Sequence, residues 1–263
     1  MFRKCAILVV FTPMFLLLGC GKAKVSFTLA GSTAFQPFAE KLAEQYMTTH
    51  KDVNITVQGG GSAVGIQSAL SGAAQIGMAD LVTLPEEAKA LTATVVARDG
   101  IAVIVNPDNQ VVGFTAPQIR DIFNGKVKNW KGVGGANAPI TVVSREAGSG
   151  TRSSFEQIVR DITLTKDALI QNSNGTIRET VANDPNAIGY LSHGMLNDKI
   201  KALKVDGQDC TTESILAGKY LLVRPIFLLV KGEVTPEIKD FIDYILSTEG
   251  QQTIKTSGLL PAK

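Results

Sequence analysis

Three loops rich in glycine and hydroxyl residues hold the side chains best suited to binding an anion. Their sequences are Ala30-Gly31-Ser32-Thr33, Gly59-Gly60-Gly61-Ser62 and Arg145-Glu146-Ala147-Gly148-Ser149-Gly150-Thr151-Arg152. Each loop follows an apolar run that predicts a strand and precedes a helical pattern. A helix N-terminus offers unpaired backbone N–H groups and a favourable dipole, and glycine lets a ligand approach the backbone. Such residues can equally be ordinary turn and capping residues. Three loops at strand ends nevertheless favour a shared anion site.

Two charged residues sharpen this interpretation. Arg145 precedes Ser149 by four residues, and its planar guanidinium can pair two ligand oxygens at once. The alternative for Arg145 is a surface ion pair with Glu146. Asp80 follows a predicted strand and can be a simple turn or cap residue. The other groups of the predicted site can donate hydrogen bonds, whereas an ionised carboxylate can only accept one. Asp80 therefore suits a ligand that carries a proton. Facing a fully deprotonated anion, it would stay unpaired at a cost of several kcal/mol.

The spacing of apolar residues predicts the elements that position these loops. Strands are expected at 25–29, 54–58 and 75–78, with helices at about 35–50 and 62–70 between them. This alternation indicates a parallel α/β sheet. A strand at 140–143 and a helix from about 151 to 159 are expected to flank the third loop. Two long β-like segments, 95–105 and 221–230, are predicted to cross between two α/β lobes. The first is interpreted as two apolar runs separated by Arg98-Asp99-Gly100.

Composition and motifs exclude several classes of protein. The chain has 263 residues, only two of them histidine, and no CxxC or HExxH motif, so neither a metal nor a cofactor is expected. Nucleotide P-loop, dinucleotide and nucleophile-elbow motifs are also missing. Of 26 basic residues, two lie in the segment predicted to be removed, which leaves 24 against 24 acidic residues. This neutral balance predicts no nucleic-acid partner and no attraction to an anionic membrane surface.

The N-terminus predicts export and a lipid anchor. Residues 1–19 combine a basic start with a short apolar stretch, which is typical of a signal peptide rather than a membrane-spanning helix. The run Leu17-Leu18-Gly19-Cys20 resembles a bacterial lipobox, in which the cysteine becomes the lipidated first residue. The alternative is a plain secretory signal that happens to contain Cys20. Once Cys5 is cleaved off and Cys20 acylated, Cys210 has no partner, and no disulfide is expected.

Several segments, in one order, resemble a known family. They are the lipobox, AGSTAFQPF, GGGSAVGIQ, GMAD, the segment 98–103, the stretch 122–130 and REAGSGTR. Together they resemble the periplasmic phosphate-binding protein of the phosphate ABC transporter. The similarity runs from about Lys24 to the C-terminus, and REAGSGTR is its most specific part.

The resemblance implies an α/β, two-lobe periplasmic-binding-protein fold of type II-like form. Each lobe would be a mixed sheet flanked by helices, and two crossing segments would form the hinge. The lobes would comprise residues 24–104 with 225–263, and residues 105–224. Phosphate would lie in the cleft, bound by Ser32, Thr33, Ser62, Asp80, Arg145, Ser149, Gly150 and Thr151. The first loop departs from longer members, which carry Thr-Phe where this chain has Ser32-Thr33.

The function implied is that of a lipid-anchored receptor outside the cytoplasm that delivers inorganic phosphate to the permease subunits of an ABC transporter. It would act as a monomer and would not be an enzyme. A binding protein for sulfate or molybdate is the first alternative. A phosphate-ester hydrolase with Ser149 or Ser62 as nucleophile is the second, although no base or metal ligand is placed beside either serine.

Overall fold

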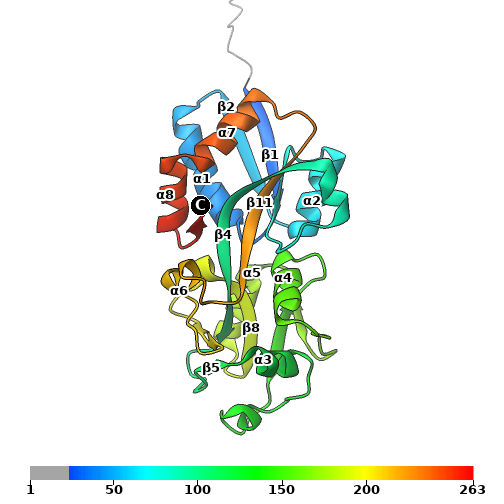
Figure 1. Cartoon of the computed structure of the whole chain (residues 1–263), viewed down its shortest axis with the longest axis vertical. Coiled ribbons are helices and arrows are strands. Elements are labelled where there is room, and N and C mark those ends of the chain that lie inside the picture. Colours follow the sequence, from blue (N-terminus) through cyan, green and yellow to red (C-terminus); the bar gives the residue numbers. More distant parts are fainter. Residues whose placement is uncertain (1–23, 263) are drawn as a thin grey trace, which may run out of the picture.

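Two lobes stacked along the long axis make up the described part of the chain (Figure 1). The structure, a computed structural model, describes residues 24–262, and the predicted signal peptide and Cys20 lie outside this range. The main sheet runs through both lobes in the order β2-β1-β3-β11-β4-β8-β6-β7, with β9 and β12 also paired to β4. Parallel and antiparallel pairs are both present. This mixed, two-lobe α/β architecture confirms the predicted fold class.

Lobe I is the lobe built on β1, β2 and β3. Its elements are β1 (Val25–Gly31), α1 (Gln36–Thr49), β2 (Val53–Gln58), α2 (Ser62–Ser71), β3 (Ile76–Ala79), η1 (Glu86–Ala90), α7 (Pro236–Leu246), α8 (Thr248–Thr256) and β12 (Leu260–Pro261). Both β2 and β3 run parallel to β1, as the alternating pattern predicted. Helix α1 forms because Phe38, Leu42 and Tyr46 recur on one face, which is buried against the sheet. The loops at the carboxyl ends of these strands therefore share one edge.

Lobe II is the lobe built on β6, β7 and β8. Its elements are β5 (Gly113–Phe114), α3 (Ala116–Phe123), η2 (Trp130–Val133), β6 (Thr141–Arg145), α4 (Gly150–Val159), β7 (Leu169–Gln171), α5 (Asn174–Asn183), β8 (Ala187–Ser192), η3 (His193–Met195), β9 (Lys201–Ala202), β10 (Lys204–Val205) and α6 (Thr212–Leu216). Thr115 caps α3 in a capping box with Gln118. Trp130 lies in the core of lobe II, where its indole N–H donates to the Asn186 carbonyl at 3.0 Å.

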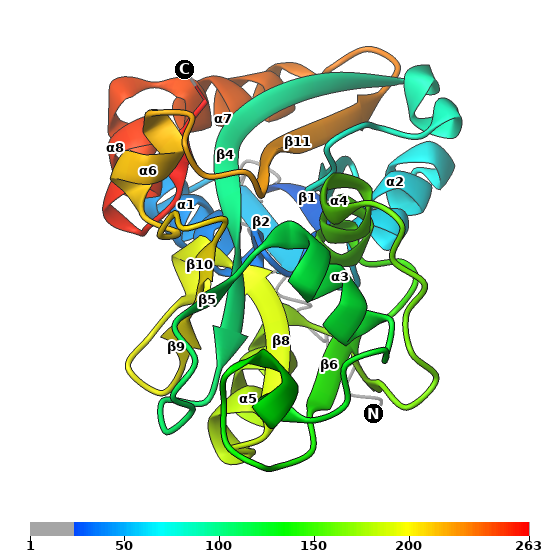
Figure 2. The same cartoon turned by 60° about the horizontal axis from the view of Figure 1, so that its bottom comes forward.

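Two long strands connect the lobes. Strand β4 (Leu91–Val105) pairs antiparallel with β11 (Val223–Lys231), and its last five residues pair with β8 of lobe II. Figure 2 shows β4 curving through both lobes. This strand agrees with the predicted long β-like segment 95–105, and Arg98, Asp99 and Gly100, which separate its two apolar runs, continue the strand. Asp99 stands opposite Arg224 in the ladder, and both side chains are fully buried.

The apolar core is divided where these strands cross. One cluster draws on residues 27–97 and 226–259, and another draws on residues 101–222 with Leu260. Between them, β4 carries residues 98–100 and β11 carries residues 223–225. The division of the core therefore coincides with the position of the charged residues Arg98, Asp99 and Arg224 in the two crossing strands. The predicted lobe limits at 104/105 and 224/225 stay a prediction.

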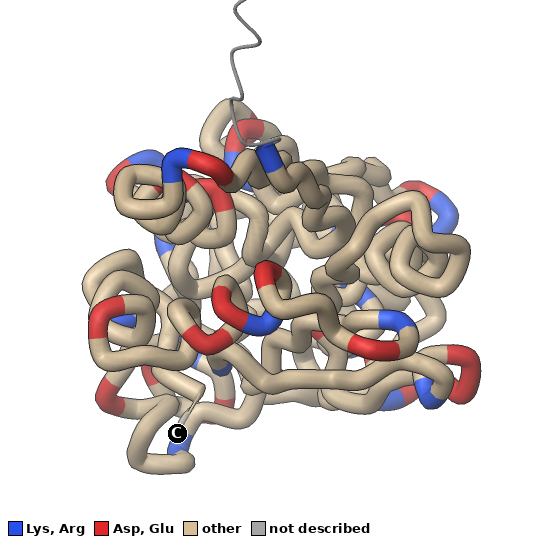
Figure 3. Tube along the Cα trace, turned by 90° about the horizontal axis from the view of Figure 1, so that it is seen from above, with Lys and Arg blue, Asp and Glu red and all other residues tan. Residues whose placement is uncertain are grey.

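The surface carries charges of both signs. Seen from above, basic and acidic positions are scattered among one another along the trace (Figure 3). Within residues 24–262, no helix combines the length and the apolar character that crossing a bilayer requires.

Candidate functional site

The three predicted loops and Asp80 lie where the two lobes touch. The loops after β1, β2 and β6 lead into α1, α2 and α4, and Asp80 follows β3. Seven of the predicted side chains are at most 8% exposed, namely those of Ser32, Thr33, Ser62, Asp80, Arg145, Ser149 and Thr151. The backbone N–H of Ala63 in lobe I donates to the Gly148 carbonyl of lobe II at 3.1 Å. The lobes are thus closed on one another around these residues.

The Asp80 carboxylate is the centre of this contact. It accepts from the Ser62 hydroxyl at 2.6 Å and from the Thr151 hydroxyl at 3.0 Å. The Ser62 oxygen in turn accepts from the Asp80 backbone N–H at 3.0 Å. The carbonyl oxygen of Asp80 accepts from the Ser154 hydroxyl at 3.1 Å. Three of the predicted residues are therefore in direct contact, and they come from both lobes.

Gly150 allows this approach because it has no side chain. A Cβ at this position would lie 2.1 Å from the Ser62 oxygen and 2.6 Å from Asp80 Oδ1. It would also lie 2.8 Å from the Asp80 carbonyl oxygen, which is part of the backbone. Gly150 is the first residue of α4, so the N-terminus of this helix rests directly on the carboxylate.

Arg145 ends β6 and points its guanidinium into the interior. Its Nε and Nη2 donate to the two carboxylate oxygens of Glu146 at 2.9 and 2.8 Å. The expected alternative, an ion pair with Glu146, is therefore present, but the Arg145 side chain is buried rather than at the surface. Nη1 of Arg145 is buried without a partner. A buried donor of this kind is available to a ligand oxygen.

The remaining hydroxyl groups bond a turn, a helix N-terminus or a shared side-chain amide. Ser32 Oγ accepts from the Phe35 N–H at 3.1 Å, and Ser149 Oγ accepts from the Arg152 N–H at 3.2 Å. In these bonds the serine oxygen is the acceptor, which leaves each hydroxyl hydrogen for a further partner. Asn174 Nδ2 donates to Thr33 at 3.1 Å and to Thr151 at 3.4 Å, and so bridges the lobes. Sequence reasoning missed Asn174. Its only local signal is its position at the start of α5, directly after the capping residue Ser173.

Sequence reasoning also missed the ion pairs behind Asp80. Arg224 Nη1 lies 2.5 Å from Asp80 Oδ2, and Nη2 lies 2.8 Å from Asp99 Oδ2. Burial raises the pKa of Asp99, and the neighbouring guanidinium opposes this shift. The protein itself supplies three partners for the Asp80 carboxylate, and the expected repulsion between Asp80 and a fully deprotonated anion stays a prediction. The signal was visible in the sequence as charged residues inside the two apolar crossing segments.

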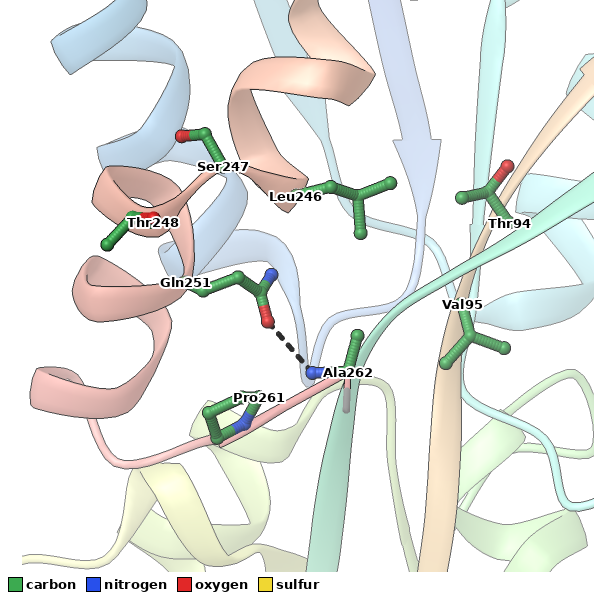
Figure 4. A pocket seen from close by; sticks show the side chains of 8 residues that line it. All are labelled: Thr94, Val95, Leu246, Ser247, Thr248, Gln251, Pro261 and Ala262. Carbon is green, nitrogen blue, oxygen red and sulfur yellow. Dashed lines mark hydrogen bonds between the residues drawn. The ribbon is translucent and has the colours of Figure 1, made fainter.

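One hollow of the surface away from the loops lacks this chemistry. It has a volume of about 530 Å³, lies in lobe I and is lined by Thr94, Val95, Leu246, Ser247, Thr248, Gln251, Pro261 and Ala262 (Figure 4). None of these residues is charged, and Gln251 is occupied by the Ala262 N–H at 2.8 Å. No group of three His, Cys, Asp or Glu residues that can hold a metal occurs in the described range.

Comparisons with known proteins agree on one family. The model of the PBP superfamily domain matches residues 20–249. The phosphate-binding protein PstS of Bacillus subtilis is 38% identical over 245 residues, which cover 91% of this chain and 82% of that protein. A Clostridium perfringens substrate-binding protein assigned to a phosphate ABC transporter, solved with bound phosphate, is 41% identical. Its structure has a TM-score of 0.88 over 90% of this chain and all of that one.

A phosphate transport receptor from Vibrio cholerae is 34% identical with a TM-score of 0.74, over 89% of this chain and 99% of that one. Fold and site thus define a two-lobe binding protein of the PBP superfamily. Within it, the chain belongs to the PstS family of phosphate-binding proteins. These relatives are receptors rather than enzymes, in agreement with the prediction that this chain has no catalytic role.

The contact at Gly150 gives a prediction about lobe closure. In Gly150→Ala, the methyl group overlaps backbone and short side chains, an overpacking that costs about 1 to 3 kcal/mol. Because the cores of both lobes are untouched, we expect the lobes to separate rather than unfold. Two amides bonded across the lobes, those of Ala63 and Val82, should then exchange with solvent roughly tenfold faster or more.

Hydrogen exchange of the purified protein measures this. Gly175→Ala is the matched control, since it also lies in the first turn of a lobe II helix but has ordinary contact space at 3.7 Å. Protection of both amides at the wild-type level in Gly150→Ala would show that this contact does not limit closure.

Proposed function

We propose that this protein captures inorganic phosphate between its lobes and passes it to the permease subunits of an ABC transporter. The observation that carries the proposal is the buried, unpartnered Nη1 of Arg145, together with the buried hydroxyl groups of the three loops. A guanidinium and several hydroxyls in a site closed to water suit a small oxyanion. The names of the relatives from B. subtilis and C. perfringens support phosphate as that oxyanion.

The proposed ligand contacts are Ser32, Thr33, Ser62, Asp80, Arg145, Ser149, Gly150 and Thr151. Ser62 and Thr151 donate to Asp80 in the closed structure, and their hydroxyls can rotate toward a ligand that itself donates to Asp80. Phosphate near neutral pH carries at least one proton, whereas sulfate and molybdate carry none. Asp80 therefore selects phosphate mainly by disfavouring its competitors.

Release to a permease requires the lobes to separate. We propose that residues 24–104 with 225–263 and residues 105–224 move as two bodies, with β4 and β11 as the hinge. The division of the apolar core at residues 98–100 and 223–225 supports this. Hinge closure of this kind is a common response of two-lobe proteins to a ligand. The same proposal includes a monomer as the working unit.

We further propose that the protein is exported and held at the outer face of the cell membrane by lipid on Cys20. The basic start, the short apolar segment and the lipobox-like Leu17-Leu18-Gly19-Cys20 support an anchor. Multiple acyl chains bury many methylene groups at about 0.8 kcal/mol each, which is enough for stable retention.

The ligand assignment is tested by titration calorimetry of the purified protein after exhaustive dialysis. We expect phosphate to bind, and sulfate and molybdate at equal concentration to give no saturable heat. Tighter binding of sulfate or molybdate than of phosphate would contradict the proposal.

Arg145→Ala tests the proposed dominant contact. Removing one partner of a buried charge pair costs roughly 2 to 5 kcal/mol, so phosphate affinity should fall about thirtyfold or more. Arg178→Ala is the control, because Arg178 is a partly exposed lobe II arginine paired with Glu179. Wild-type affinity in folded Arg145→Ala would place this residue outside the site.

Cys20→Ala tests the anchor. The variant should lose acylation and leave the membrane fraction, because no acyl chain then remains to hold the body. Cys5→Ala, which changes a cysteine within the predicted signal peptide, should fractionate as wild type does. Continued membrane retention of Cys20→Ala would rule out this anchor.

A further inference from the structure

We propose that Arg224 is a positioning residue that holds the Asp80 carboxylate as a hydrogen-bond acceptor and thereby sets the preference for a protonated oxyanion. The inference rests on the proposed function, but it assigns the selectivity to a residue outside the ligand loops. Arg224 acts through Asp80, whose carboxylate it contacts at 2.5 Å from within strand β11.

The geometry makes Arg224 the cation that faces Asp80. Its side chain is fully buried, and its two Nη atoms pair separate carboxylates, those of Asp80 and Asp99. Helices α2 and α4 present the hydroxyls of Ser62 and Thr151 to the Asp80 carboxylate and that of Ser154 to its carbonyl, and none of these groups is charged. The charged groups around Asp80 are therefore Arg224 from β11 and, behind it, Asp99 from β4.

Charge decides what Asp80 can do. A carboxylate beside a guanidinium stays ionised and can only accept a hydrogen bond. A buried carboxyl group without a cation favours its neutral form, which carries a proton and can donate. A neutral carboxyl at this position would donate to a bare sulfate oxygen, and the barrier against sulfate would disappear. The cation thus controls selectivity without touching the ligand.

Asp99 shares this cation, and its other oxygen accepts from the Ser192 hydroxyl of lobe II at 2.9 Å. The pair Arg224–Asp99 lies where the apolar core divides. A purely structural role for the pair is therefore the competing explanation. The two roles differ in outcome, because structural damage weakens every anion alike, whereas loss of the cation changes the ratio between anions.

The double variant Arg224→Gln/Asp99→Asn separates the roles. It replaces the buried ion pair by two amides, so Asp80 loses its neighbouring cation. Because Asp99 is also neutralised, no unpaired negative charge is left at position 99. We expect the ratio of phosphate to sulfate affinity, measured by calorimetry at one pH and salt concentration, to fall roughly tenfold or more. Sulfate should bind detectably, which loss of structure alone would not produce.

Asp99→Asn alone is the matched control and the second measurement. This variant removes the Arg224–Asp99 ion pair but keeps the ion pair between Arg224 and Asp80. It also removes one negative charge near the site. We expect phosphate affinity equal to or higher than that of wild type, with the preference over sulfate retained. If the double variant fails to fold, this single variant decides, because loss of its preference for phosphate would overturn the inference.

Arg224→Lys supplies a rescue, since an ammonium keeps the positive charge and should keep sulfate excluded. A folded double variant with the wild-type ratio would overturn the inference while leaving phosphate binding intact. If the wild-type protein binds no phosphate, the proposed function fails, and the inference fails with it.

Discussion

The buried carboxylate of Asp80 is the constraint on which the arrangement of the site depends. An ionised carboxylate removed from water is costly unless charge and hydrogen bonds compensate for it. The compensation comes from Ser62 on α2, Thr151 on α4 and Arg224 on β11. These groups belong to lobe I, lobe II and a crossing strand. Satisfying one side chain therefore fixes the distance between the lobes and the geometry at the hinge together.

Closure relies on polar contacts and on a few apolar ones, since Leu260 of lobe I joins the lobe II cluster and Met195 packs against both clusters. The two large apolar clusters divide at the crossing strands, and the bonds across the lobes are hydrogen bonds such as Ala63 N–H to the Gly148 carbonyl. Each such bond contributes only about 0.5 to 1.5 kcal/mol net. An interface of this strength can open and close without unfolding either lobe. A small anion that pairs with donors of both lobes can then shift the balance toward the closed form.

Much of this arrangement could be predicted from the sequence. The alternation of apolar runs located β1, α1, β2, α2 and β3 to within a few residues, because local periodicity governs these elements. The glycine and hydroxyl loops were located because turn and cap chemistry is local. Their convergence was inferred from the strand-end rule and is seen directly in the contacts of Asp80 with Ser62 and Thr151.

What sequence reasoning missed depends on long-range pairing. Arg224 and Asp80 are 144 residues apart, and no local pattern encodes that they meet. The same holds for Asn174 and Thr33, which are 141 residues apart. The sequence showed Asp99 between the two apolar runs of the predicted segment 95–105 but not the partner that lets a charged residue lie inside a strand. Its partner on the neighbouring strand is what makes β4 continuous.

The most direct test of the central claim is a crystal structure of this protein with phosphate bound. The account predicts phosphate between the lobes, with one oxygen facing Arg145 Nη1. Another oxygen should lie about 2.5 to 2.7 Å from the Asp80 carboxylate, which is the distance of a short hydrogen bond from a hydroxyl to an ionised acceptor. Phosphate bound elsewhere, or an Asp80 carboxylate out of hydrogen-bonding reach of it, would contradict the account.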